Sequence, residues 1–268
     1  MDKLALNGLT AADYMHPDEK FFADKSPANI FVFRKGFDLV SDLSVKFLRQ
    51  VTEGKWVELN RSTAPEVFDV AQEAASILNC PTLPRMFVRR VRQLKIIVGG
   101  TDCSQMLIPE FILEEFDRQM QLFAFGNALS MFKCGHVQLA TISSVLCEGM
   151  MSAVAALTVQ AYLRAADLSS DRGGLLCCQD FTAAARVILT ETGLPLSELR
   201  YLDATETLRL VENYLDEAES ASFDMLTENA KLFRRTTNDT SPLAFRLREL
   251  LTWYRDGYET VLARRCVR

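Results

Sequence analysis

Residues that could do chemistry are few in this chain. It contains two histidines, His16 and His136, which lie far apart in the sequence. A catalytic zinc usually has three protein ligands, one or more of them histidine. This scarcity argues against most zinc enzymes. It also leaves a Ser-His-Asp or Cys-His arrangement unsupported, because the fold alone would have to bring a nucleophile to either histidine.

The stretch FGNALSMFKCGH, which ends at His136, has the spacing of a metal-binding helix without its ligands. Asn127 and Met131 are four residues apart and share a helix face, as the two histidines of a His-Glu-x-x-His zinc helix do. Ala128 stands where such a helix carries its general base. His136 lies off that face and cannot replace either ligand. Next to Gly135, we expect it to belong to a structural cap rather than to a catalytic group.

Other chemistry-bearing motifs are missing from the sequence. It has no G-x-S-x-G elbow, no P-loop and no G-x-G-x-x-G pattern, since Gly173-Gly174 is followed by two leucines. None of the seven cysteines forms a C-x-x-C pair, which excludes a zinc ribbon or a thioredoxin-like motif. The net charge of −5 argues against nucleic acid as a partner, because neutralising phosphates requires clustered lysine and arginine.

The cysteines and the N-terminus together predict a cytoplasmic protein. The first twenty residues contain no apolar signal segment, so we expect free thiols in a reducing compartment. The longest apolar run, residues 149–163, is shorter than the ~20 residues that a membrane span needs. We therefore expect a buried helix there and no membrane span.

These motifs lie in a frame that resembles the HtpX-like, Ste-type zinc metallopeptidases (metallopeptidase family forty-eight), in particular their soluble bacterial members. The family pattern G-H-E-x-G-H-I-x-x-G-H aligns with residues 126–136, where the first glycine and the closing Gly-His are present. The family's third zinc ligand, a glutamate in an S-E-F-S-A-D-R-A motif, aligns with Asp167. The supporting aspartate of that motif aligns with Asp171, and its arginine with Arg172.

The resemblance extends over residues 14–256, with a further departure outside the altered zinc-binding positions. Lys95-Ile96-Ile97 stands where the family tends to have Asn-Ala-Tyr, in the strand beside the substrate. The other matching elements are His16-Pro17, Gly36-Phe37-Asp38, Leu176 to Asp180, and Arg246, Glu249 and Trp253 of an R-x-x-E-x-x-x-W helix.

This resemblance implies a zincin-like fold and argues against the family's activity. Ala128 cannot accept a proton, the thioether of Met131 is poorly suited to zinc, and Asn127 offers a neutral amide oxygen. We therefore expect no catalytic residue and no cofactor; zinc would bind only if the site is not degenerate. The predicted function is that of a pseudopeptidase that binds a peptide or protein partner, for instance as an extended strand added to the sheet edge.

Several alternatives stay open at this point. One is a residual metal-dependent hydrolase with a non-standard site, in which Asp167 and Asp171 share a metal or a proton. Another alternative to the pseudopeptidase is a partner subunit for an active paralogue. Asn127, Ala128 and Met131 either form a remodelled ligand pocket or, as we favour, fill the space that the zinc left.

The carboxylates Asp167 and Asp171 also have a structural interpretation. We expect Asp171 to pair locally, with Arg172 or Arg164, and Asp167 to remain as a relic that faces solvent or needs a new partner. A metal site built from Cys134, Asp167 and Cys177 is the remaining, disfavoured arrangement.

The elements that position these residues are predicted to form one α+β domain, mostly α, over residues 1–268. Three runs in the region 55–108 favour a small antiparallel meander, with MFVRRV and LKIIVG joined at Arg92-Gln93. The degenerate active-site helices are expected at about 117–134 and 160–176, and C-terminal helices at 180–260. Individual helices are predicted at 38–51, 64–78, 109–133, 136–164, 166–176, 180–193, 204–219, 222–234 and 241–256. Asp203 and Glu206 have the spacing of a capping box at the start of the helix over 204–219.

Overall fold

The computed structural model describes residues 4, 6–19, 56–90, 95–99, 105–137, 153–220 and 243–266. These residues are mostly helical and contain a small sheet of four strands, which confirms the prediction of a mostly helical α+β chain. The helices predicted at 38–51 and 222–234 lie outside the described residues, as do most of 136–152 and the Gly-Phe-Asp element.

The sheet is mixed, so the predicted antiparallel meander is wrong. Its order is β1-β2-β4-β3; β4 runs parallel to β2 and antiparallel to β3. Arg92-Gln93 lacks the Gly, Asn or Asp that a two-residue hairpin turn needs, whereas every residue of β4 is buried, as in a central parallel strand. The strands are β1 (Glu58–Leu59), β2 (Arg85–Arg89), β3 (Ile97–Gly99) and β4 (Gln105–Pro109).

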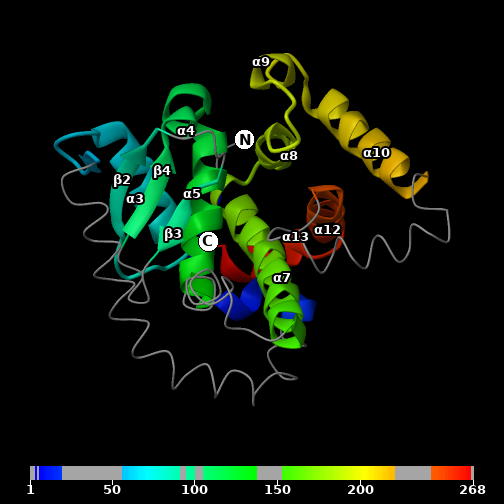
Figure 1. Ribbon diagram of the computed structural model, residues 1–268, viewed down its shortest axis with the longest axis horizontal. Helices are drawn as coiled ribbons and strands as arrows, with labels where there is room; N and C mark the ends of the chain where they lie inside the picture. Colours follow the sequence, from blue (N-terminus) through cyan, green and yellow to red (C-terminus); the bar gives the residue numbers. More distant parts are fainter. Residues whose placement is uncertain are drawn as a thin grey trace.

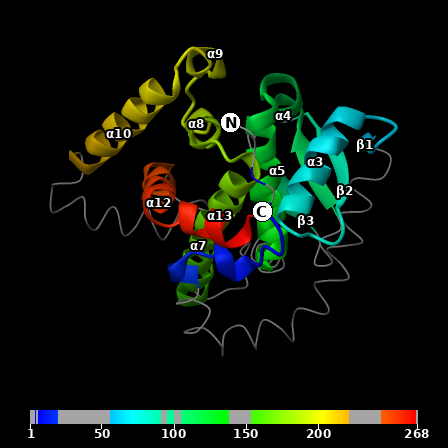
Figure 2. The same cartoon turned by 180° about the vertical axis from the view of Figure 1, so that it is seen from behind.

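Helix α5 (Arg118–Lys133) stands at the centre of the fold (Figure 1). The sheet and α3 (Pro65–Ile77) lie on one side of it. On the other side lie α7 (Ala153–Cys178), α8 (Phe181–Thr190) and α12 (Leu243–Asp256), as the reverse view in Figure 2 also shows. The helix predicted over 109–133 is divided into α4 (Glu110–Glu115) and α5. The division arises because the side chain of Asp117 accepts a hydrogen bond from the Met120 amide at 2.9 Å and caps a new helix.

Helix α7 (Ala153–Cys178) is continuous, so the predicted break near residue 165 does not occur. Alanines at 165 and 166 are strong helix formers, and both are buried.

Glycines let α7 approach α5 closely. A Cβ added to Gly173 would lie 1.7 Å from Ser130 Oγ, and one added to Gly126 would lie 2.7 Å from Cys177 Sγ.

The remaining helices complete one continuous hydrophobic core that also includes residues of the sheet. A capping box starts α10 as predicted: the Asp203 amide donates to Glu206 Oε2 and the Glu206 amide to Asp203 Oδ1, each at 2.8 Å. The helices are α8 (Phe181–Thr190), α9 (Leu196–Leu199), α10 (Ala204–Ser220), α12 (Leu243–Asp256) and α13 (Tyr258–Arg265).

Candidate functional site

Helix α5 places its three altered motif positions in different surroundings. Asn127 is 5% exposed and takes part in a polar network. Ala128 is buried in the hydrophobic core, and Met131 is partly buried against that core. Of the three, Asn127 is thus the one that brings a polar group to the site.

The Gly-His pair after α5 serves two separate structural purposes. Gly135 has φ +77° and ends the helix, its amide donating to the Phe132 carbonyl at 3.0 Å. His136 is completely buried, and its Nε2 lies 2.6 Å from Glu19 Oε1. The helix cap that we expected at His136 is therefore provided by Gly135. His136 instead pairs with the carboxylate of Glu19 in the N-terminal segment.

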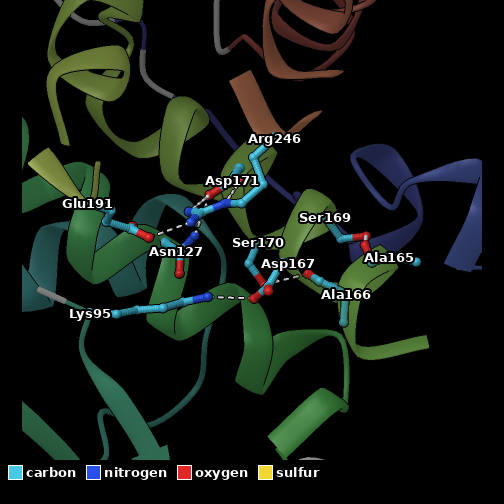
Figure 3. A network of polar contacts seen from close by, with 10 residues as sticks. All are labelled: Lys95, Asn127, Ala165, Ala166, Asp167, Ser169, Ser170, Asp171, Glu191 and Arg246. Carbon is cyan, nitrogen blue, oxygen red and sulfur yellow. Dashed lines mark hydrogen bonds and ion pairs between the residues drawn. The ribbon is translucent and has the colours of Figure 1, made fainter. Parts of the chain in front are cut away.

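Asp171 of α7 is the centre of a buried polar network that joins four helices (Figure 3). Asn127 Nδ2 donates to Asp171 Oδ1 at 2.8 Å. Arg246 of α12 binds the same carboxylate through two atoms, Nη2 to Oδ1 at 2.8 Å and Nε to Oδ2 at 2.9 Å. Its Nη1 reaches Glu191 Oε2, at the end of α8, at 2.6 Å. The predicted local pairing of Asp171 is thus replaced by a guanidinium from far along the chain.

Burial and the charged partners act in opposite directions on both central groups. Burial raises the pKa of Asp171 above its ordinary value, although the charge and hydrogen bonds of Arg246 lower it. Three N–H donors from Asn127 and Arg246 converge on this carboxylate. Burial alone would lower the pKa of Arg246, but Asp171 and Glu191 more than offset this, so the pKa of Arg246 is raised well above its ordinary value.

Asp167 has a cationic partner of its own. It lies one turn before Asp171 on α7, with its side chain 7% exposed, and Lys95 Nζ is 2.5 Å from its Oδ1. Lys95 comes from the residues just before β3, and in Figure 3 its side chain extends past Asn127 towards Asp167. An ammonium group therefore contacts the carboxylate that the family resemblance predicts at the position of a zinc ligand.

The space between these groups is small. A cavity of about 10 Å³ is lined by Lys95, Asn127, Glu191 and Arg246, together with apolar side chains of α5, α8 and Ile96. That volume is close to the minimum for one water molecule. Substrate-sized groups do not fit while the lysine is in place.

The residues present do not fit a zinc ion. The Asn127 amide is turned to donate to Asp171, and Asp167 holds an ammonium group.

The alternative metal site of Cys134, Asp167 and Cys177 does not form either. Cys134 Sγ lies 3.6 Å from Tyr14 Oη. Cys177 Sγ lies 3.7 Å from the Ala74 carbonyl, so these cysteines do not join Asp167. In the part of the chain that the structure describes, no group of three or more His, Cys, Asp or Glu side chains is arranged to hold a metal.

A second buried cluster lies on the opposite side of α7. Glu19 accepts from Ser169 Oγ at 2.5 Å and lies 2.6 Å from His136 Nε2. In a hydrolase triad the imidazole stands between the hydroxyl and the carboxylate. Here the carboxylate stands between the other two, so the histidine cannot take the serine proton, and the cluster holds the N-terminal segment rather than a nucleophile.

The flanking motif residues contact one another across helices. The His16 ring accepts from the Asp18 amide through Nδ1 at 3.2 Å, which places its proton on Nε2, 3.1 Å from Glu249 Oε2. Arg172 donates to the Met15 carbonyl and lies over the Trp253 ring at 5.3 Å. Burial lowers the pKa of Arg172 to about 10.

Sequence reasoning missed Lys95, Glu19, Ser169 and Glu191. For Lys95 a signal existed, because it departs from the Asn-Ala-Tyr pattern. No family model, curated protein or solved structure matches this chain, so its function is inferred from the site. None of the helices within the described ranges has both the length and the apolar character that a membrane crossing requires.

Proposed function

We propose that this chain is a catalytically inactive protein of the zincin-like, HtpX-like metallopeptidase type, which works by binding a peptide or protein partner. The observation that carries the proposal is the Lys95 ammonium, 2.5 Å from Asp167. It supplies a positive charge at the carboxylate that would otherwise help to hold zinc. The Lys95 ammonium thus takes the place of the catalytic ion, but it cannot polarise a bound water in the way that zinc does.

Contacts between the motif residues support the kinship. Arg246, Glu249 and Trp253 were singled out as one pattern on a C-terminal helix, and each contacts a residue of another matching motif. Arg246 binds Asp171, Glu249 pairs with His16, and Trp253 lies against Arg172. Such convergence is what a shared fold with a degenerate centre would produce.

Binding is the function that remains once the hydrolytic groups are lost. Ala128 has no proton acceptor, and Asp171 already accepts from three donors. The sheet, in contrast, offers a surface for an extended segment. Among the described strands β3 pairs only with β4, and main-chain groups at such an edge can add a strand from a partner.

Metal content is the direct test of this proposal. Untagged protein is dialysed against zinc-containing buffer, then against metal-free buffer, and analysed by elemental mass spectrometry together with an assay of fluorescent casein. We expect far less than one zinc per chain and no release of peptides. About one zinc per chain with chelator-sensitive hydrolysis would favour the alternative, a metal-dependent hydrolase with a non-standard site.

A restoration experiment tests the role assigned to the lysine. The variant Asn127→His, Met131→His, Lys95→Ala restores two ligands and removes the ammonium from Asp167, whereas its control keeps Lys95 beside the two new histidines. We expect zinc binding in the first variant and at least about tenfold weaker binding in the control, because ammonium and metal compete for one carboxylate. Equal zinc affinity in both variants would contradict the idea that Lys95 stands in for the metal.

A further inference from the structure

Lys95 and Asp167 are held very differently although they form one ion pair. Asp167 is fixed on α7, with its side chain 7% exposed, whereas the Lys95 side chain is 26% exposed and precedes the edge strand β3. Lysine carries its charge on a flexible four-carbon stem. The ammonium can therefore leave by rotation of the side chain, without any movement of a helix.

Departure of Lys95 would open the small cavity described above. The lysine side chain is part of its wall, and the other polar groups of the wall belong to Asn127, Glu191 and Arg246. Arg246 cannot follow Lys95 or replace it, because the guanidinium is fully buried and already binds both Asp171 and Glu191. The opened space would take in the volume of the Lys95 side chain, whose Nζ lies 2.5 Å from Asp167 Oδ1.

Electrostatics decides what can occupy that space. The Asp167 side chain is 7% exposed, and removing the ammonium that lies 2.5 Å from this carboxylate is unfavourable. A replacing group that carries a positive charge would restore that contact, whereas a neutral group would not. A segment lying along β3 would place its side chains beside the opening, and a lysine or arginine among them would supply that positive charge. The chain's net charge of −5 also favours a basic partner.

We propose that Lys95 is an internal ligand that keeps this cleft closed, and that a partner peptide binds along β3 by placing its own lysine or arginine side chain on Asp167. This inference rests on the proposed function, since it requires a binding cleft rather than a metal centre. Asp167 then makes binding selective, because a neutral peptide that displaces Lys95 loses the contact between ammonium and carboxylate, whereas a basic side chain restores it.

The first test is chemical rescue. Lys95→Ala deletes a fragment equivalent to n-propylammonium, which is added at increasing concentration while the melting temperature is measured; n-propanol is the neutral control. We expect n-propylammonium, and not n-propanol, to raise the melting temperature of Lys95→Ala. Wild type and Lys95→Ala/Asp167→Asn should not respond. Equal effects of amine and alcohol, or rescue that persists without Asp167, would overturn the proposal.

The second test uses peptides. Ac-Ala-Ala-Lys-Ala-Ala-NH2 and its norleucine analogue, of nearly the same shape but uncharged, are titrated into Lys95→Ala and followed by NMR. We expect at least about tenfold tighter binding of the lysine peptide, with shifts at β3 and α7. Equal affinities, or a response to zinc chloride and to neither peptide nor amine, would overturn the assignment of a basic side chain.

A comparison of stable variants covers the case in which Lys95→Ala does not fold. Lys95→Arg keeps a cation for Asp167, and Lys95→Met keeps most of the stem without the charge. We expect Lys95→Arg to melt close to wild type and Lys95→Met to melt lower, with the loss largely recovered in Lys95→Met/Asp167→Asn. A Lys95→Met protein as stable as wild type would contradict the internal-ligand role.

Failure of this inference and failure of the proposed function give different results. Zinc-free, inactive wild-type protein whose Lys95→Ala variant ignores amines would remove the basic-ligand inference alone. Wild-type protein that retains zinc and hydrolyses casein would remove the proposed function, whatever the amines do.

Discussion

Arg246 and Asp171 form the most deeply buried ion pair of the site. Both side chains are 1% exposed, and both carboxylate oxygens accept from the guanidinium. Asn127 adds a third donor from α5. Asparagine is suited to this position because its amide donates a hydrogen bond without adding another charge to a buried network.

Arg246→Met should destabilise the protein by about 3–5 kcal/mol, because it leaves the Asp171 carboxylate buried without a cation. Urea unfolding of wild type and variant measures the difference. The control is Arg255→Met on the same helix, whose partner Glu212 is exposed; that pair should contribute at most about 1 kcal/mol. Similar costs for both variants would show that the buried pair has no special role.

Helices α5 and α7 are the elements that hold the site together. Asn127 lies on one helix and Asp167 and Asp171 on the other, so the distance between the helices fixes the distance between these groups. Gly126, Gly173 and Gly174 allow the close approach, since a Cβ on Gly174 would lie 2.8 Å from the Phe123 carbonyl oxygen. The glycines thus position the network without taking part in it.

Gly173→Ala should cost about 1–3 kcal/mol, as overpacking does in a close-packed core. Its new Cβ would collide with Ser130 Oγ at 1.7 Å and Ser130 Cβ at 2.7 Å. The cost is measured by urea unfolding in the wild-type background and again in a Ser130→Gly background, where the colliding atoms are gone. We expect a smaller cost in the second background; an unchanged cost would place the strain elsewhere.

At the scale of the whole molecule, the N-terminal segment fastens helices that are distant in sequence. Leu4 exchanges two main-chain hydrogen bonds with the Gln179 side chain, Asp13 binds Arg265, and Glu19 binds His136. His16 links the same segment to Glu249 on α12. These contacts bring the beginning of the chain to its end, where Leu6 and Cys266 form a β-bridge.

The His16–Glu249 link predicts a pH dependence of stability. The hydrogen bond from His16 lowers the pKa of Glu249 from its ordinary 4.5. A carboxyl with a lowered folded-state pKa contributes stability that is complete above the ordinary pKa and is lost as pH falls through the folded-state pKa. The stability difference between wild type and Glu249→Gln should therefore shrink below pH 4.5. Urea unfolding across this range measures it.

The control for that pH series is Glu259→Gln, an exposed glutamate on α13. Its unfolding should follow wild type at every pH. If the difference between wild type and Glu249→Gln instead grew on acidification, the carboxylate would not be stabilised by folding, and the assigned link between the N-terminal segment and α12 would be wrong.

Local sequence patterns predicted much of the fold. The capping box at Asp203 and Glu206 and the apolar periodicity of α3 depend on residues close in sequence, and the structure confirms both. Strand pairing was mispredicted because it depends on which strand is buried on both faces. That property of β4 is decided by the helices packed around it. The predicted two-residue turn at Arg92-Gln93 paired β2 with β3, whereas each of these strands pairs with β4.

The sequence by itself determined that Asn127, Ala128 and Met131 cannot perform the chemistry of a His-Glu-x-x-His helix, because a side chain's proton acceptors and ligand atoms are fixed by its type. Only the tertiary structure decided what neutralises the remaining carboxylates. Lys95 and Arg246 reach Asp167 and Asp171 from positions 72 and 75 residues away in sequence. Such pairs form where burial makes an uncompensated charge costly, and burial is a property of the folded chain.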